Sequence, residues 1–548
     1  MAKTETKPKG SMALVVAASA AGTAFEWYDF FLFVPLAGII ARNFAAGLTG
    51  AASLVFALAA FAIGFAFRPV GALIFGRIGD RLGRKGAFMV TMSLMGAATF
   101  CIGLLPSYQS IGAWSPAIFI SLRMIQGIAL GGEWGGAAIY ITEHAKPEQR
   151  GVMGSWLGGS AAFGLAGALL VVLAVRTVTG EDKFAAWGWR LPFLFSSILL
   201  AISIWIRLKL SESPIFAKLK EEGGRSTKPY TESFLVWDGL KRVLIVLFAI
   251  MIAQGAVWYT CFFYAQFFLE NVVKTSPPLV NLIMIGICFA SAPMYVFFGW
   301  LSDKIGRKPV MLFGMILTVV AAFPGFQAMT VFANPDLARA VAASPVTVVA
   351  DPDTCSVQFD PVGKRQFSSG CDIAKNVLTT SGVSYKNVAA LPGTPTTVKM
   401  GVFSFPSPEG GGLSPADLKA LKADTGDRLK AALANQGYPL KAEPKETNTL
   451  GLILVLLVLS VGATALYGPQ AAALVEMFPT KIRYTALSLP YHIGTGWVGG
   501  FLPATAYAMV AAKGDIYYGL WYPVVVTTVA IVTMFLFLPE TKGETLDF

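Results

Sequence analysis

The sequence is short of charge and of the residues that build enzyme and metal sites. Only 14% of its 548 residues are Asp, Glu, Lys or Arg, and it contains two histidines and five cysteines. The cysteines lack the spacing of metal ligands, and no nucleophile–base set stands out, so neither an enzyme nor a bound cofactor is expected. Because 55% of the residues are hydrophobic and the mean hydropathy is +0.61, the composition also excludes an ordinary soluble domain of this length.

Long hydrophobic runs are abundant instead. Twelve of them are long enough to cross a bilayer core of about 30 Å, at 14–40, 52–76, 86–106, 114–140, 151–178, 190–209, 240–270, 279–300, 308–330, 448–475, 485–511 and 517–538. Lys and Arg concentrate in the loops on one side of these spans, which places both termini in the cytoplasm. The net charge of +11 therefore reflects topology, and nucleic-acid binding is not expected. The first span follows Met1 to Ser11 directly, so no cleavable signal peptide is expected.

One charged phrase occurs twice between apolar runs. GRIGDRLGRK at 76–85 returns as GWLSDKIGRK at 299–308. Asp80 and Asp303 are 223 residues apart, which indicates two related halves, an arrangement common in secondary transporters.

A second repeat consists of Glu143-x6-Arg150 after the fourth span and Glu476-x6-Arg483 after the tenth. Its offset of 333 residues exceeds that of the first repeat by 110, so an insertion lies between the ninth and tenth spans. Short alternating stretches and a helix capped by Ser414 predict a small α+β domain there, outside the cytoplasm.

The chain thus divides into five parts. We expect a six-helix bundle, a cytoplasmic linker, helices 7–9, the extracytoplasmic insertion and helices 10–12, at 1–209, 210–239, 240–330, 331–447 and 448–548. Cys355 and Cys371 both fall in the insertion, where oxidation is permitted, and we predict a disulfide between them.

The charged residues of the loop phrase are of the types that bind the ends of neighbouring helices. We predict that Asp80 faces the positive N-terminus of a neighbouring span, while Arg81 and Arg84 meet carboxylates such as Glu143. Such contacts would hold the two halves together in one state and release them in the other. The predicted gate comprises Asp80, Arg81, Arg84, Glu143, Arg150, Asp303, Arg307, Glu476 and Arg483. The alternative is that the basic residues merely set topology.

Five ionisable residues lie inside predicted spans, and each has a neutral counterpart in the second half: Glu26, Asp29, Arg68, Arg123 and Glu133. Because charge is costly in a bilayer, each is a functional candidate. We predict that Glu26 and Asp29 couple protons through a contact with Arg123 that forms and breaks. A static ion pair is the alternative. For Arg68 and Glu133 we favour a structural ion pair.

Several polar residues of the spans are candidates for binding substrate. We assign this role to Arg123, Gln126, Tyr28, Gln254, Tyr259 and Tyr264, although a membrane tyrosine can equally be an interface anchor or a packing residue. We interpret His492 as a residue that makes a polar contact between helices rather than as a proton relay.

The loop phrase resembles the signature of the major facilitator superfamily. More narrowly, EWYDF at 26–30, FRPVG at 67–71, the RxxQGxxxGGEWG pattern at 123–135 and WGWRLPF at 187–193 are similar to the metabolite:proton symporter family. The resemblance covers both halves but not the insertion. It implies a twelve-helix fold of two pseudo-symmetric six-helix bundles in the bacterial inner membrane, with alternating access. It further implies that Asp29 and Arg123 match the coupling pair of the related sugar:proton branch.

The resemblance and the buried charges together predict proton-coupled symport of a small organic acid or zwitterion, by a monomer with no cofactor other than the proton. Two alternatives stay open. One is an exporter or proton antiporter on the same fold, and the other is a sensor that uses the outer domain.

Overall fold

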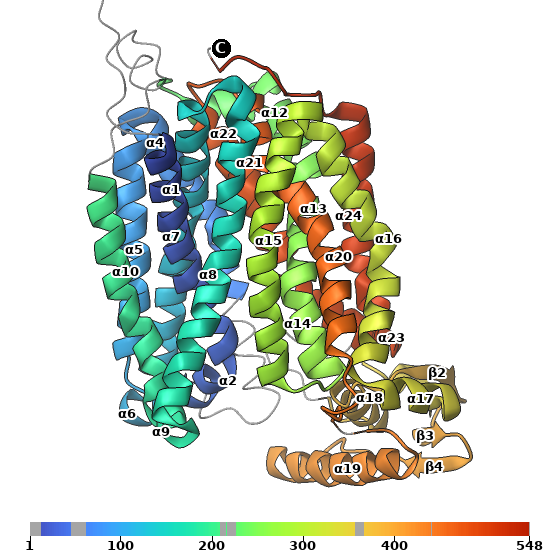
Figure 1. Ribbon diagram of the computed structural model, residues 1–548. Helices are drawn as coiled ribbons and strands as arrows, with labels where there is room; N and C mark the ends of the chain where they lie inside the picture. The colour runs from blue at the N-terminus through green and yellow to red at the C-terminus, as the bar shows by residue number, and fades with distance from the viewer. Residues whose placement is uncertain are drawn as a thin grey trace, which may run out of the picture.

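The computed structural model describes residues 12–44, 62–208, 215, 226–356, 367–439 and 441–546. Its helices stand side by side as two bundles, with the first half of the chain in blue to teal and the second in green to red (Figure 1). Part of the predicted second span and half of the predicted linker at 210–239 lie outside the described residues.

The first bundle contains the helices before residue 209. They are α1 (Met12–Phe31), α2 (Phe33–Phe44), α4 (Arg68–Leu82), α5 (Arg84–Leu104), α6 (Tyr108–Ile111), α7 (Trp114–His144), α8 (Arg150–Thr179), α9 (Glu181–Ala186) and α10 (Leu191–Leu208). Glycines let α4 and α7 touch backbone to backbone: a Cβ on Gly131 would lie 2.2 Å from the carbonyl oxygen of Arg68.

The second bundle begins with one long helix interrupted by π-helical turns. It consists of α12 (Trp237–Val246), η4 (Leu247–Met251), α13 (Ile252–Tyr259), η5 (Thr260–Tyr264), α14 (Ala265–Phe267) and η6 (Phe268–Val272). The bundle continues with α15 (Pro277–Ile305), α16 (Arg307–Ala333), α20 (Thr449–Tyr467), α21 (Gln470–Met477), α22 (Arg483–His492), η8 (Ile493–Gly499), α23 (Leu502–Lys513) and α24 (Trp521–Phe537).

The repeated loop phrase makes the same turn in both bundles. Gly83, between α4 and α5, has φ +121°, and Gly306, between α15 and α16, has φ +108°. Only glycine adopts this conformation without strain, which explains why the phrase keeps a glycine at this position in both copies.

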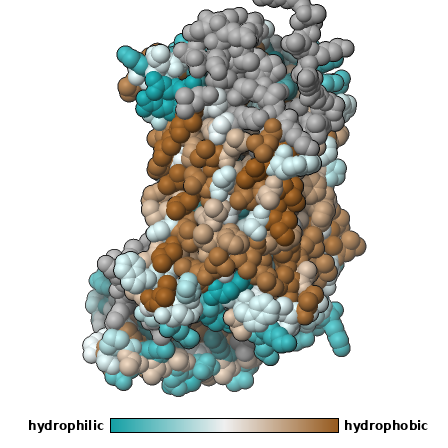
Figure 2. All heavy atoms as spheres, turned by 90° about the vertical axis from the view of Figure 1, so that its left-hand side faces the viewer, coloured by the Kyte–Doolittle hydropathy of each residue, from teal (hydrophilic) through white to brown (hydrophobic). Residues whose placement is uncertain are grey.

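Nine helices of the described residues are long and apolar enough to cross a membrane. On the face that Figure 2 shows, a hydrophobic belt lies between hydrophilic residues toward the two ends. The predicted spans at 14–40, 114–140 and 485–511 are helical but are not among the nine. These three segments carry most of the buried polar groups discussed below, including Asp29, Arg123 and His492.

The segment between α16 and α20 forms a separate layer at one end of the molecule (Figure 1). Its sheet has the order β2-β1-β3-β4, with β1 parallel to β2 and the other neighbours antiparallel. The strands are β1 (Val346–Ala350), β2 (Tyr385–Ala389), β3 (Thr397–Met400) and β4 (Phe403–Pro406), and the helices are α17 (Pro335–Ala343), α18 (Gly370–Thr380) and α19 (Pro415–Asn435).

This layer has its own hydrophobic core. The predicted disulfide is present, with Cys355 and Cys371 joined at a Cα–Cα distance of 5.3 Å. The cap at α19 is also present, since the Ser414 hydroxyl accepts the backbone N–H of Asp417. α16 ends at Ala333 and α20 begins at Thr449, beside the limits of 331–447 that the composition predicted for the insertion.

Candidate functional site: an interlocked mouth and an aromatic cavity

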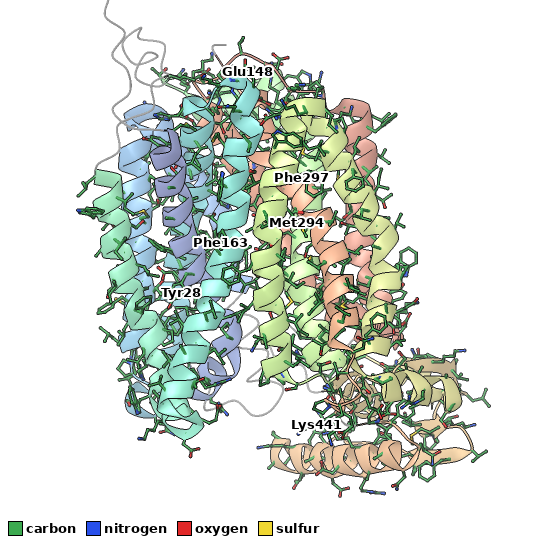
Figure 3. The ribbon with its side chains drawn as sticks, in the orientation of Figure 1. Tyr28, Glu148, Phe163, Met294, Phe297 and Lys441 are labelled. Atoms are coloured by element: carbon green, nitrogen blue, oxygen red, sulfur yellow. A yellow bond between two sulfur atoms is a disulfide. The ribbon has the colours of Figure 1, made fainter. Side chains whose placement is uncertain are left out.

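The two bundles are joined at the end of the molecule opposite the insertion. Glu148, just before α8, and Lys441, in the insertion, mark the two ends (Figure 3). At the Glu148 end, Asp303, in the last turn of α15, accepts backbone N–H groups from Gly151 (2.9 Å) and Val152 (2.8 Å), at the start of α8. The carboxylate therefore caps a helix of the other bundle, where it also meets the positive end of the helix dipole.

Asp80 makes the equivalent contact in the opposite direction. Its carboxylate accepts the backbone N–H groups of Tyr484 (3.2 Å) and Thr485 (2.8 Å), at the start of α22. The contact predicted for Asp80 with a helix N-terminus is thus found, and the repeat extends it to Asp303.

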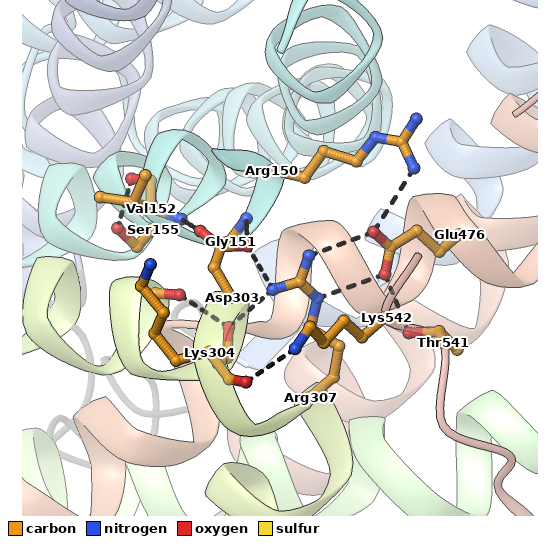
Figure 4. Close-up of polar contacts among 12 residues, drawn as sticks. Arg150, Gly151, Val152, Ser155, Asp303, Lys304, Arg307, Glu476, Thr541 and Lys542 are labelled. Carbon is orange, nitrogen blue, oxygen red and sulfur yellow. Dashed lines mark hydrogen bonds and ion pairs between the residues drawn. The ribbon is translucent and has the colours of Figure 1, made fainter. Parts of the chain in front are cut away.

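Arginines cross the same interface (Figure 4). Arg307 binds Asp303 and donates to both oxygens of Glu476, at 3.2 and 3.3 Å. Arg150, from the first bundle, lies 3.6 Å from Glu476. All four side chains are buried or nearly so, which makes the network sensitive to the loss of any member.

The counterpart pair joins Arg483 to Glu143 at 2.7 Å, with both side chains fully buried. Glu143 had been expected to meet Arg81 or Arg84. Arg81 lies exposed at the same end, and the side chain of Arg84 lies outside the described residues. The sequence missed the Arg483 contact because each repeat was read within its own half, whereas the pairs form between halves.

The C-terminal segment, residues 538–546, closes over this network. The Glu540 carboxylate accepts the N–H groups of Arg307 and Lys308, and the Thr541 hydroxyl donates to Glu476 at 2.9 Å. The carbonyl oxygens of Glu544 and Leu546 accept from Arg150 and Arg483. We call this end of the molecule, opposite the insertion, the mouth. It is closed in this conformation by side chains of both bundles and by the chain end.

The predicted proton-coupling residues lie inside the first bundle. Arg123 Nη1 donates to the Gln126 side chain (2.8 Å), whose amide donates to the Thr99 hydroxyl (2.7 Å) on α5. Asp29 approaches Thr99 and interacts electrostatically with Glu26. The carboxylate of Asp29 and the guanidinium of Arg123 are thus connected through the neutral side chains of Gln126 and Thr99.

Asp29 and Arg123 do not bind each other directly in this conformation. Among the described residues, Oδ1 of Asp29 and the Nε and Nη2 atoms of Arg123 have no hydrogen-bond partner. The Arg123 guanidinium instead lies over the rings of Phe30 and Phe33, at 5.1 and 4.6 Å. The proposed contact that forms and breaks stays a prediction.

The predicted ion pair between Arg68 and Glu133 is not formed. Arg68 Nε donates to Nδ1 of His492 in the second bundle, at 3.1 Å. The reason lies in the helix contact: α7 meets the Arg68 backbone at Gly131. Glu133 lies two residues further along α7, about 200° around the helix axis, so its side chain leaves on the far side.

A small cavity of about 10 Å³, room for about one water molecule, lies between the two bundles. Its wall is mostly aromatic and comes from both halves: Trp27, Ala161, Gln254, Trp258, Tyr259, Tyr467, Tyr491 and Thr495. Trp27 and Trp258, equivalent positions of the two halves, lie 6.5 Å apart between ring centroids.

Two of the six predicted substrate-binding residues, Gln254 and Tyr259, line this cavity. The other four face elsewhere. Arg123 and Gln126 point into the first bundle, and the Tyr28 hydroxyl donates to the carbonyl of Pro192. Tyr264 packs against Phe326 at a centroid distance of 5.5 Å.

Four of the five aromatic wall residues, Trp27, Trp258, Tyr467 and Tyr491, were missed, although the sequence carried a signal for the first three. Trp27 and Trp258 align in the repeat around the first and seventh spans, and Tyr467 follows Trp134 by the offset of the second repeat. Trp134 stacks on Tyr491 with 3.8 Å between centroids and lies 6.4 Å from Tyr467. Charged residues drew the prediction away from aromatic residues that repeat at the same offsets.

Comparison with known proteins agrees with this architecture. Residues 19–335 match the Major Facilitator Superfamily, and residues 431–547 match the family described as sugar (and other) transporter. These two matches flank most of the insertion. A structure of the proton:xylose symporter XylE bound to 6-bromo-6-deoxy-D-glucose aligns over 98% of this chain and 97% of that chain, with a TM-score of 0.66 and 16% identity.

Curated relatives are transporters of bacteria. The proline/betaine transporter of Escherichia coli (strain K12) is 35% identical over 328 residues, covering 58% of this chain but only 65% of that protein, which is less than two thirds of its length. The inner membrane metabolite transport protein YhjE of the same organism is 34% identical over 343 residues, covering 61% of this chain and 76% of that protein. On these matches, the chain belongs to the major facilitator superfamily.

Proposed function

We propose that the chain is a multi-pass membrane transporter that imports a small organic acid or zwitterionic metabolite together with protons, by alternating access. The observation that carries the proposal is the pair of reciprocal helix caps at Asp80 and Asp303, which ties the bundles together at one end while a cavity lies between them. A transporter that exposes a central site to one side at a time needs contacts that close one end of the molecule and can break.

The topology of the proposal follows from the loop charges. Twelve helices cross the inner membrane, with both termini and the interlocked mouth in the cytoplasm and the insertion outside. The chain acts as a monomer, because each reciprocal contact is completed within one molecule.

Proton coupling is proposed for the buried carboxylates of the first bundle. Asp29 and Glu26 are only 5% and 3% exposed, and they interact with each other. Protonation of one would relieve their repulsion, and approach of Arg123 would drive the proton off again. The names of relatives support this direction, since they include proline/betaine and shikimate transporters and a proton:xylose symporter.

The test is uptake into proteoliposomes with an imposed pH gradient, screened across 2-oxoglutarate, citrate, shikimate, aromatic acids and betaines. We expect an inward proton gradient to drive accumulation of one of these solutes. Asp29→Asn should abolish gradient-driven accumulation while leaving exchange of labelled for unlabelled solute measurable.

A matched control exists in the second half. Thr260 occupies the position equivalent to Asp29, and its hydroxyl donates to the Ala256 carbonyl. Thr260→Val should leave accumulation intact. Accumulation by Asp29→Asn would contradict the coupling assignment, and faster loss of solute from preloaded vesicles as protons enter would favour antiport.

A further inference from the structure

Tyr484 is the residue at which the two reciprocal caps differ. The second repeat aligns it with Gly151, since both directly follow the arginine of that repeat. Both residues donate their backbone N–H to an aspartate of the opposite bundle, Tyr484 to Asp80 and Gly151 to Asp303. The backbone contact is therefore the same at both caps, and only the cap at α22 carries a large side chain.

The Tyr484 side chain fills a socket of glycines on the first bundle, which we call the glycine socket and which consists of Gly79, Gly132 and Gly136. Tyr484 is fully buried, and its ring lies where a Cβ on Gly79 of α4 would overlap it. On α7, the carbonyl of Gly132 accepts the Tyr484 hydroxyl, and a Cβ on Gly136 would lie 2.6 Å from the hydroxyl oxygen. The ring thus fits only because these positions carry no side chain.

The ring and the glycine socket belong to different bundles, so the contact between them must break whenever the mouth opens. It differs in kind from the charged network beside it, because a ring is packed against backbone. Packing of this sort weakens steeply within a fraction of an ångström. The ring therefore has two arrangements, inside the socket and outside it, as expected of an element that switches between two states.

The same face of α22 extends from the mouth to the cavity. Tyr491 follows Tyr484 after about two helical turns, so the two side chains lie on the same side of the helix. Tyr491 lines the cavity and stacks on Trp134 of α7, with 3.8 Å between ring centroids. Movement of α22 away from α7 would therefore change the cavity wall and the mouth together.

We propose that Tyr484 is a gating residue of the mouth: the mouth stays closed while the Tyr484 ring occupies the glycine socket, and it opens when α22 withdraws the ring. This inference rests on the alternating access of the proposed function and names a side chain that controls it at one end. Because Tyr491 lies on the same face of α22, a change at the cavity wall reaches the gate through one helix.

The glycine socket can be filled by substitution. Spin labels at the exposed positions Lys146 and Lys481, one in each bundle at the mouth, report the ratio of open to closed molecules through the distance between them. The measurement uses the full chain with its three free cysteines replaced by serine. We expect Gly136→Ala to raise the ratio of open to closed molecules roughly 5- to 100-fold, as overpacking of a buried site does.

Removal of the Tyr484 hydroxyl should reverse this effect. The atom nearest to the added Cβ is the hydroxyl oxygen, whereas the ring carbon that carries it is 3.1 Å away. Tyr484→Phe alone loses one hydrogen bond and should raise the ratio about 2- to 10-fold. The double variant should be no more open than Tyr484→Phe alone, because the collision is gone. Independent effects on helix stability would add instead.

Gly86→Ala is the matched control, since a Cβ there meets no atom within 4 Å. It should leave the ratio unchanged. The proposal would be overturned by additive effects in the double variant, or by a ratio in Gly136→Ala no higher than in Gly86→Ala. If Gly136→Ala does not fold, Tyr484→Ala replaces it: emptying the glycine socket should raise the ratio, and an unchanged ratio would overturn the proposal.

Failure of the proposed function is distinguishable, because the distance measurement needs no solute. A mouth whose opening depends on Tyr484, in a chain without gradient-driven uptake, would leave this inference standing and remove the proposed import. Gradient-driven uptake together with a mouth insensitive to the glycine socket would do the reverse.

Discussion

The two copies of the charged loop phrase make the same contact, yet what surrounds them differs. Asp80 receives two N–H groups at the start of α22, and Asp303 receives two at the start of α8, with distances between 2.8 and 3.2 Å. Duplication of the fold has thus preserved the reciprocal cap, in which each half holds a helix of the other.

The ion pairs beside the caps have diverged. Arg483 binds Glu143 directly at 2.7 Å, whereas Arg150 lies 3.6 Å from Glu476, which also binds Arg307. The two ion pairs that join the bundles thus differ in length, 2.7 Å against 3.6 Å. The helix cap is therefore the closing contact that both copies share, whereas the ion pairs beside it differ between the copies.

The largest effect is expected from the caps themselves. Asp80→Asn and Asp303→Asn each lose the charge on a doubly bonded acceptor, about 1.5–3 kcal/mol per affected hydrogen bond. Both should shift the mouth toward the open state. Spin labels at the exposed positions Glu148 and Lys304, in a background with Cys101, Cys261 and Cys288 replaced by serine, would report a longer distance between the bundles. Opening by only one of the two variants would break the equivalence of the caps.

Substitutions in the two ion pairs should have unequal effects on the closed mouth, unlike substitutions in the two caps. Arg483→Gln removes a fully buried 2.7 Å contact and should weaken the closed mouth by about 3 kcal/mol. Arg150→Gln leaves Glu476 with Arg307, so we expect less than about 1 kcal/mol. The same label distance measures both, and equal effects would show that the difference in contact geometry has no energetic consequence.

The Glu540 side chain of the chain end binds beside the second copy of the loop phrase. Glu540 accepts the N–H groups of Arg307 (2.8 Å) and Lys308 (3.1 Å) at the start of α16. Glu540→Gln should cost about 1 kcal/mol, the usual value for a lost helix cap, and speed amide hydrogen exchange in the first turn of α16. Glu544→Gln is the control, because Glu544 contributes its carbonyl rather than its side chain. Faster exchange in both variants would contradict the assignment.

The smallest effect concerns the insertion, which has no counterpart in the first half. The Tyr385 hydroxyl donates to the Ala511 carbonyl at 2.8 Å, and burial raises the pKa of Tyr385 from 10.0 to about 12. The contribution to docking is therefore complete below pH 10 and is lost as the pH rises through about 12. Tyr385→Phe should cost about 0.5 kcal/mol and remove this pH dependence.

Hydrogen exchange in the segment between α23 and α24 measures that docking. Tyr438→Phe is the matched control, because the Tyr438 hydroxyl donates to Ser344 inside the insertion. It should loosen the insertion without changing exchange in that segment. A change there with Tyr438→Phe, or none with Tyr385→Phe, would show that the docking does not depend on this bond.

The sequence predicted the parts of the molecule that depend on local pattern. Apolar runs indicated the helices. The offset between two repeats indicated the size of the insertion, and composition indicated its limits, because these signals lie along the chain. The helix cap of Asp80 could be predicted since the glycine turn and the acid recur together.

Contacts between halves were harder to predict. Arg68 was assigned to Glu133 in its own half, but it binds His492, because the rotation of α7 about its axis is set by glycine contacts that no charge pattern reveals. Most of the cavity wall, apart from Gln254 and Tyr259, was missed for a related reason. This wall consists mostly of aromatic residues, which in a membrane sequence look like ordinary packing until the two halves are brought together.

The insertion is fastened to loops of the second bundle. Lys274 Nζ donates to Thr380, Asn334 donates to Val273, and the N–H of Tyr385 donates to Gly514 at 2.7 Å. If the bundles rock against each other, the insertion moves together with the second bundle, at the outer end of that bundle. A fluorophore on α19 would then convert small angular changes at the membrane midplane into large displacements above the surface, giving a readout of the transport cycle that leaves the interlocked mouth and the cavity untouched.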